Sequence, residues 1–228
     1  MRRFFVLICI AATSLSAHDI ISTKITFSRE ISRILYQRCA SCHHDGGAAF
    51  SLETYEAARP WAKAIKEEVL SRRMPPWGAV KGFGEFRGDR SLTQVDLEII
   101  ADWVEGGAPE GDPRLLPAMP QFPPAANDRA WPAGARETAL DGAVTLHHAE
   151  MLTAIRPKAL PEGTSVKVVA ERPDGSIEPL VWIENYRAAF CRTYIFAAPL
   201  PFPAGTRVVM SPETAGGTFS LFDMAAQK

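Results

Sequence analysis

Apolar positions with helical spacing recur in three stretches of the first half of the chain. The first stretch predicts an amphipathic helix whose apolar positions are Phe27, Ile31, Ile34 and Leu35. The second predicts a short helix over 51–59 and another that begins at Pro60. The third begins with the capping pattern Ser91-Leu92-Thr93-Gln94 and ends at Gly106. Its apolar positions are Leu92, Val95, Ile99, Trp103 and Val104. We expect the first and last helices to pack together, because each has one apolar face to bury.

From about residue 141 the pattern changes to short strands separated by turns. Segments 165–170 and 177–183 flank Arg172-Pro173-Asp174-Gly175-Ser176, which predicts a β-hairpin. Further short strands are expected over 192–196, 207–210 and 218–222. Strands at regular spacing between glycine and proline turns are typical of a small, mainly antiparallel β-sandwich.

The segment between the two patterns, residues 109–134, contains seven prolines, which favours an extended linker over a packed element. At the N-terminus, Arg2 and Arg3 precede an apolar run and small residues, the pattern of a secretory signal peptide cleaved near Ala17. The run is shorter than the roughly 20 residues that span a bilayer. We therefore expect a periplasmic or otherwise exported protein with no membrane span in its mature form. The expected divisions are 1–17, 26–113, 114–140 and 141–228.

Composition narrows the possible partners. The chain has 228 residues and a formal net charge of −1, which gives no electrostatic footprint for nucleic acid. A hydrophobic fraction of 46% suits a globular protein of one or two domains and argues against intrinsic disorder.

The strongest chemical signal is Cys39-Ala40-Ser41-Cys42-His43. It has the C-x-x-C-H spacing at which two thiols form thioethers with haem vinyl groups and the histidine becomes an axial iron ligand. A redox disulfide or half of a zinc site are the alternatives. The first would need a flanking βαβ pattern and the second another C-x-x-C pair, and the sequence has neither. Haem attachment would leave Cys191 as the unpaired cysteine of the exported chain, predicted to be a core residue.

Met74-Pro75-Pro76-Trp77 is the second informative stretch. A loop stiffened by two prolines can hold a thioether sulfur toward iron, so Met74 is the predicted second axial ligand, with core packing as the alternative. Nearby, Arg72 and Arg73 are expected to end a helix or to pair with a haem propionate. Phe83 and Phe86 are candidates to cover the haem edge.

Residues 27 to about 113 resemble small single-haem cytochromes c that carry the haem motif near their start. The resemblance rests on the C-x-x-C-H motif, on Met74-Pro75-Pro76, and on a last helix that ends Trp103-Val104-Glu105-Gly106-Gly107-Ala108-Pro109. It implies an all-α cytochrome c domain, followed here by a small mainly antiparallel β-sandwich domain, so the expected class is multidomain, α then β. It also implies that Cys39 and Cys42 attach one haem c and that His43 and Met74 ligate its iron. The chain continues for more than a hundred residues beyond the family's usual end.

The C-terminal half weakly resembles β-sandwich modules found beside cytochrome c domains, some of them related to copper-dependent monooxygenases. Their His-x-His pattern is missing, because His147 and His148 are adjacent and would point to opposite faces of a strand. We expect a docking module and a protein that passes single electrons between redox partner proteins. Two alternatives stay open: a haem enzyme or a gas or peroxide sensor with a displaceable Met74, and a cytochrome subunit of a larger oxidoreductase complex.

Overall fold

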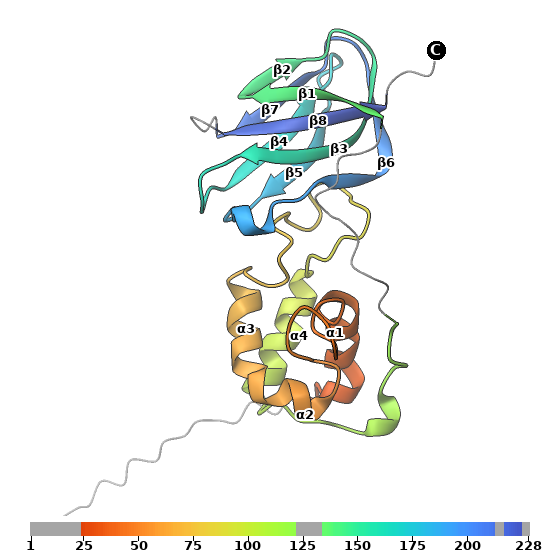
Figure 1. The fold of residues 1–228 in the computed structure, drawn as a ribbon, viewed down its shortest axis with the longest axis vertical. Coiled ribbons are helices and arrows are strands. Elements are labelled where there is room, and N and C mark those ends of the chain that lie inside the picture. The colour runs from red at the N-terminus through yellow and green to blue at the C-terminus, as the bar shows by residue number, and fades with distance from the viewer. Residues whose placement is uncertain (1–23, 122–133, 213–216, 225–228) are drawn as a thin grey trace, which may run out of the picture.

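A computed structural model describes residues 24–121, 134–212 and 217–224. The expected signal peptide, 1–17, lies outside these residues. Helices from the first half of the chain gather at one end of the molecule and strands from the second half form a β-sandwich at the other (Figure 1). Among the described residues, no helix combines the length and the apolar character needed to cross a membrane.

The helical region consists of short elements. A π-helical turn (Phe27–Ile31) continues into α1 (Ser32–Arg38). The others are α2 (Tyr55–Ala58), a 3-10 turn (Arg59–Trp61), α3 (Ala62–Leu70), α4 (Gln94–Glu105) and a second 3-10 turn (Pro113–Leu115). Phe27 packs against Trp103 with ring centroids 6.3 Å apart, which confirms the expected contact between the first and last helices.

The start and the buried face of α4 differ from the prediction. A capping box is present, but it joins Thr93 and Asp96 rather than beginning at Ser91. The side chains that α4 buries are Leu97, Ile100 and Trp103. Val95, expected on the apolar face, is 60% exposed, so the real face is rotated from the one that the apolar spacing indicated.

The sandwich is made of two four-stranded antiparallel sheets. One has the order β1 (Ala135–Asp141), β8 (Thr218–Met224), β3 (Glu150–Ala159), β6 (Tyr194–Phe202). The other has the order β2 (Ala143–Thr145), β7 (Arg207–Ser211), β4 (Val166–Glu171), β5 (Ile177–Ile183). The predicted hairpin is confirmed, because β4 pairs with β5 across the 172–176 turn. Strand β1 begins inside the segment assigned to the linker, and the longest strand, β3, lies where no specific strand was predicted.

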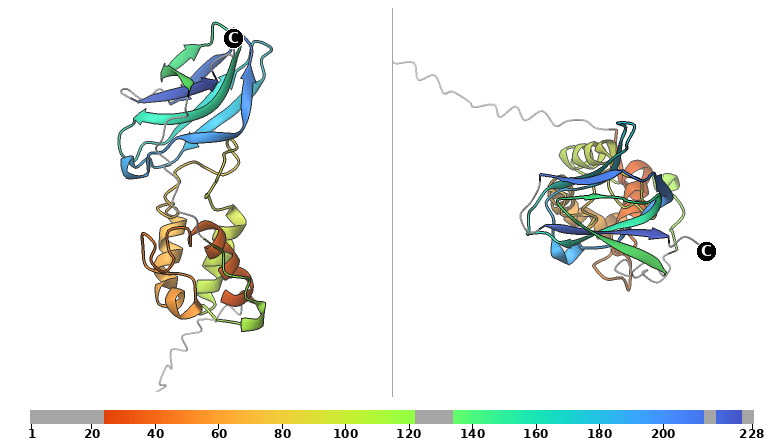
Figure 2. Two further views of the ribbon diagram at one scale, coloured as in Figure 1. Left: turned by 45° about the vertical axis from the view of Figure 1, so that its right-hand side comes forward. Right: turned by 90° about the horizontal axis from the view of Figure 1, so that it is seen from above.

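The segment that joins α3 to α4 does not stay with the helices. Residues 75–88, here called the strap, run into the sandwich and return (Figure 2). Ala79 forms a bridge with Ile183 at the end of β5, and Phe86 forms one with Phe196 in β6. Since β5 and β6 are edge strands of different sheets, the strap closes the open side of the sandwich between them.

The strap also supplies part of the sandwich core. Trp77, Ala79 and Phe86 are between 5% and 7% exposed and belong to the same buried cluster as the inward-facing residues of both sheets. The rings of Trp77 and Phe86 both pack on Tyr194, at centroid distances of 5.4 and 5.2 Å. Trp77 and Phe86 therefore bury their rings in the sandwich core and not among the helices.

The expected fold class, an all-α cytochrome c domain followed by a small β-sandwich domain, is wrong. The described chain is mostly β, with two four-stranded antiparallel sheets and only short helices, and no all-α cytochrome domain is seen in it. The physical reason is the strap: its buried aromatic side chains come from the predicted helical domain but complete the core of the sandwich.

Candidate functional site

The C-x-x-C-H motif forms one further turn at the end of α1. The amides of Cys42 and His43 both donate to the carbonyl of Cys39, each at 3.0 Å. Side chains three and four residues apart lie on the same side of such a turn. Both thiols and the imidazole therefore belong to a single turn of the chain.

The His43 ring is oriented by a backbone carbonyl. Its Nδ1 lies 2.9 Å from the carbonyl oxygen of Phe50, and a carbonyl can only accept, so Nδ1 carries the proton. When Nδ1 carries the one proton of the ring, Nε2 keeps its lone pair. A hydrogen bond of this kind through the other ring nitrogen is how proteins orient histidine ligands of metals. The ring of Phe50 packs edge-on against His43 at a centroid distance of 4.9 Å.

The loop after the motif folds back onto it. The amide of Ala49 donates to the carbonyl of Cys42 at 3.0 Å, and the amide of Leu52 donates to the carbonyl of His43 at 2.9 Å. A Cβ at Gly47 would lie 2.6 Å from the carbonyl oxygen of Cys42, so only glycine allows this approach. The loop thereby brings Phe50 within reach of the His43 ring.

The Cys39 thiol has the electrostatics of a buried group. Burial raises its pKa to about 12; the Arg38 charge opposes this rise, and Cys42 and Asp96 add to it. Redox-active C-x-x-C pairs depend instead on a lowered thiol pKa, because the thiolate is the reactive form. The environment of Cys39 is therefore unlike that of a redox disulfide.

Met74 follows α3 and lines a cleft that is open to solvent. Its side chain is 36% exposed and so is not packed in the core. Apolar side chains on the cleft wall include Val69, Leu92 and Leu97. Within the described part of the chain, Cys39, Cys42 and His43 are not among the residues that line it.

The two arginines before Met74 have acidic partners. Arg72 forms an ion pair with Glu184 at 3.0 Å, which links the end of α3 to the residue that follows β5. Arg73 binds both carboxylate oxygens of Glu68, at 2.7 and 2.8 Å, and this pairing lowers the pKa of Glu68.

Several other candidates lie away from the motif. Phe86 is buried in the sandwich core, so the prediction that it covers a haem edge is wrong, and the half-buried Phe83 packs on Trp182. His147 and His148 are exposed between β2 and β3. The half-buried Cys191 thiol packs against the sandwich core and donates to the carbonyl of Pro157 at 3.2 Å.

Sequence reasoning missed two contributors to the site. Phe50 orients His43 through its backbone carbonyl, a contact that any residue type can make and that no sequence pattern signals. Arg192, more than a hundred residues after Met74, donates to the carbonyl of Pro76 at 2.6 Å. Its position beside the Met74 loop depends on how the sandwich meets the helical region.

The residue types on the C-x-x-C-H turn are those that a covalently attached haem would need. Two thiols and an imidazole share one turn, and the Met74 thioether is exposed at a cleft that none of these three residues lines. No cluster of three or more His, Cys, Asp or Glu side chains suited to a metal ion occurs among the described residues. Comparisons with protein-family models, with curated proteins and with solved structures found no match.

Proposed function

We propose that this chain is an exported electron-transfer protein that carries one haem attached through Cys39 and Cys42. The observation that carries the proposal is the His43 ring, whose Nδ1 is held by the Phe50 carbonyl so that Nε2 can bind iron. The proposal concerns the C-x-x-C-H turn and Met74, and it does not require an all-α domain.

Each residue has a distinct role in this proposal. Cys39 and Cys42 anchor the group, and the loop held against the motif fixes the imidazole. Met74 is the proposed second iron ligand, since it is exposed at a cleft instead of packed in the core. A haem held by histidine and methionine exchanges single electrons at a raised reduction potential with both axial positions closed. The partners would be donor and acceptor redox proteins.

The first test is covalent attachment. Protein produced with the haem maturation machinery should keep its haem after denaturation and show a c-type optical spectrum. Replacing Cys39 and Cys42 together with serine should abolish attachment, whereas Cys191→Ser, a thiol in the sandwich, should leave it unchanged. Haem that extracts freely from the wild-type protein would disprove the proposal.

The second test addresses Met74. Methionine sulfur bound to ferric haem iron gives a weak red absorption band, which Met74→Ala should abolish. Met151→Ala is the matched control, because Met151 has a similar exposure, 40%, and lies on β3 in the sandwich. A band that survives Met74→Ala would exclude Met74 as ligand.

A haem enzyme or sensor is the second candidate, and the exposure of Met74 favours it, because an exposed ligand is easier to displace. The ferrous protein would then take up carbon monoxide without denaturation. An electron carrier with a firmly bound Met74 should not.

A further inference from the structure

The loop that contains Met74 is fixed to the sandwich immediately after the methionine. Arg192 donates from Nη2 to the carbonyl of Pro76 at 2.6 Å, and its guanidinium lies 5.0 Å from the centre of the Trp77 ring. The Tyr194 hydroxyl donates to the carbonyl of Trp77. Two side chains of the sandwich therefore hold two successive carbonyls, the second and third after Met74.

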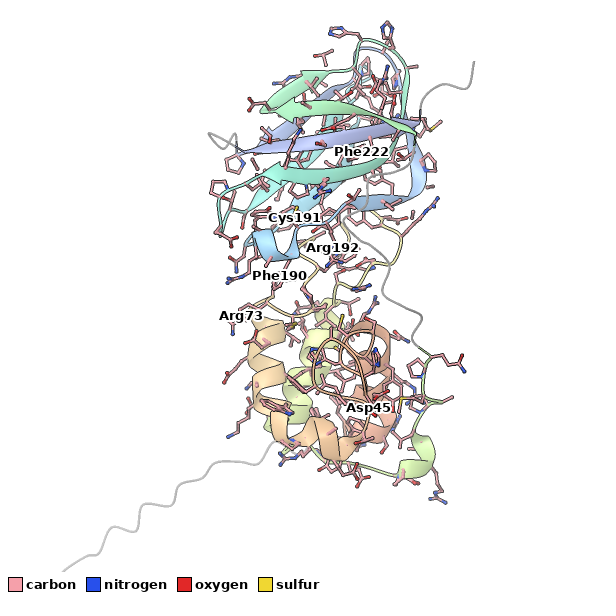
Figure 3. All side chains as sticks on the ribbon, in the orientation of Figure 1. Asp45, Arg73, Phe190, Cys191, Arg192 and Phe222 are labelled. Carbon is pink, nitrogen blue, oxygen red and sulfur yellow. The ribbon has the colours of Figure 1, made fainter. Side chains whose placement is uncertain are left out.

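These two anchors are buried. Arg192 is 8% exposed and Tyr194 is 2% exposed. Figure 3 labels Phe190 and Arg192 at the end of the sandwich that faces the helices, and Arg73 at the end of α3 opposite them. A buried guanidinium bound to a carbonyl is held tightly, because in the interior it has no water to replace that acceptor.

The side-chain contact with the sandwich that precedes Met74 in the chain is an exposed ion pair and is therefore weaker. The Arg72–Glu184 ion pair joins side chains that are 41% and 38% exposed. Exposed ion pairs contribute little, because water and salt screen them. The amide of Met74 itself donates to the carbonyl of Glu68 in α3 at 3.1 Å, and Arg192 and Tyr194 hold the residues that follow it.

The strap continues this attachment beyond Trp77. The amide of Val80 donates to the carbonyl of Trp182 at 2.8 Å, and the amide of Glu184 donates to the carbonyl of Gly78 at 3.1 Å. The chain after Met74 is consequently part of the sandwich within a few residues. A movement of the sandwich would move this loop.

We propose that Arg192 and Tyr194 are positioning residues that hold the Pro76–Trp77 backbone and thereby keep the Met74 thioether in place as an axial ligand. The sandwich then determines whether the second axial position is closed, in addition to any docking role. This inference rests on the proposed haem function. If the anchors are removed, the loop gains freedom, Met74 binds less of the time, and the reduction potential falls toward that of a haem without methionine.

The test uses the full-length haem protein and the variants Arg192→Ala and Tyr194→Phe. Arg172→Ala is the matched control, because Arg172 makes the same kinds of contact elsewhere in the sandwich. It donates to the carbonyl of Pro201 at 3.0 Å, and its guanidinium lies 4.7 Å from the centre of the Phe202 ring. Readouts are covalent haem content, the red methionine band, the midpoint potential and carbon monoxide uptake.

We expect both anchor variants to keep their covalent haem, lose most of the methionine band, shift to a lower potential and take up carbon monoxide. Arg172→Ala should match the wild type in all four of these readouts. Tyr194→Phe removes only a hydroxyl, so it remains informative if Arg192→Ala does not fold. Arg192→Lys should retain part of the band, because it keeps the charge and one donor.

The possible failures are distinguishable. Wild-type protein without covalent haem would disprove the proposed function itself. Covalent haem without a methionine band in the wild type would overturn the positioning role and leave attachment standing. Wild-type band and potential in a folded Tyr194→Phe and a folded Arg192→Ala would overturn the positioning role alone.

Discussion

The helical region and the sandwich complete their cores in different ways. The helical region leaves large apolar side chains in solvent: Phe50 is 47% exposed, Trp61 45% and Leu70 52%. Phe50 stacks on Trp61 at a centroid distance of 4.5 Å and also contacts His43. The sandwich also leaves aliphatic side chains in solvent, Ile177 at 64% and Ile195 at 40%, but it buries the aromatic rings of Trp77 and Phe86 that the strap brings into its core.

This difference indicates what each region lacks on its own. The sandwich is completed by the strap, whose Ala79 and Phe86 pair with residues more than a hundred positions later in the chain, Ile183 and Phe196. Exposed apolar side chains beside the C-x-x-C-H turn are what we expect of a region that completes its core with a bound group. The proposed haem would cover such a surface.

The largest predicted effect on stability comes from removing a ring that the strap buries in the sandwich core. Phe86→Ala should lower the free energy of unfolding of the sandwich by about 3–5 kcal/mol, since a ring buried among Trp77, Tyr194 and Phe196 is lost. Urea unfolding followed by far-ultraviolet circular dichroism measures it. Phe83→Ala is the control with a smaller loss, because Phe83 is only half-buried and packs on one side of Trp182. Equal, small losses in both variants would contradict a shared core.

A smaller effect on stability is expected from substitutions at two glycines of the strap. Gly82 and Gly84 have nearly equal positive φ values, 82° and 81°. Alanine at either position costs about 1–2 kcal/mol for the left-handed backbone. At Gly84 a Cβ would also lie 2.3 Å from the carbonyl oxygen of Leu180 in β5, whereas at Gly82 nothing lies within 4 Å. Gly84→Ala should therefore be clearly less stable than Gly82→Ala in thermal unfolding, and equal melting temperatures would argue against the close contact between strap and β5.

The smallest effect concerns buried charge in the sandwich. Arg136 pairs with Glu150 at 2.9 Å and with Asp223 at 2.6 Å, and burial, with the Asp223 charge, raises the pKa of Glu150 although Arg136 opposes it. A raised folded-state pKa gives stability that is complete below the unfolded pKa and is lost as pH rises through the folded value. Glu150→Gln should therefore become more stable relative to the wild type as pH rises from 4 to 7.

The pKa of Glu137, in β1 of the same sheet, is shifted in the opposite direction. Its hydrogen bond from Ser220 and its pairing with Lys158 lower its pKa. Its stabilisation is present above the unfolded pKa and is lost as pH falls through the folded one. Glu137→Gln should lose stability near pH 7 and differ little from the wild type at low pH. Denaturation curves at several pH values measure both variants, and parallel curves for the two would contradict the opposite shifts.

The elements and the motif could be predicted from local sequence, because local interactions decide them. The turn at Arg172–Ser176 and the end of α4 at Gly106 follow from residues close in the chain. The C-x-x-C-H turn likewise needs only the hydrogen bonds that end α1. The buried face of α4 was predicted less well, since Val95 is apolar but has no partner element to cover it.

What only the tertiary structure decided is where the strap goes and what holds the two proposed axial ligands. A glycine-rich segment with Trp77 and Phe86 could cover a haem edge as readily as a sheet edge, and its sequence does not distinguish the two. The contacts that fix His43 and the Met74 loop end on the backbone carbonyls of Phe50, Pro76 and Trp77. Every residue type carries such a carbonyl, so the sequence by itself determined the chemistry of the donor groups, and the packing of distant segments determined how they are held.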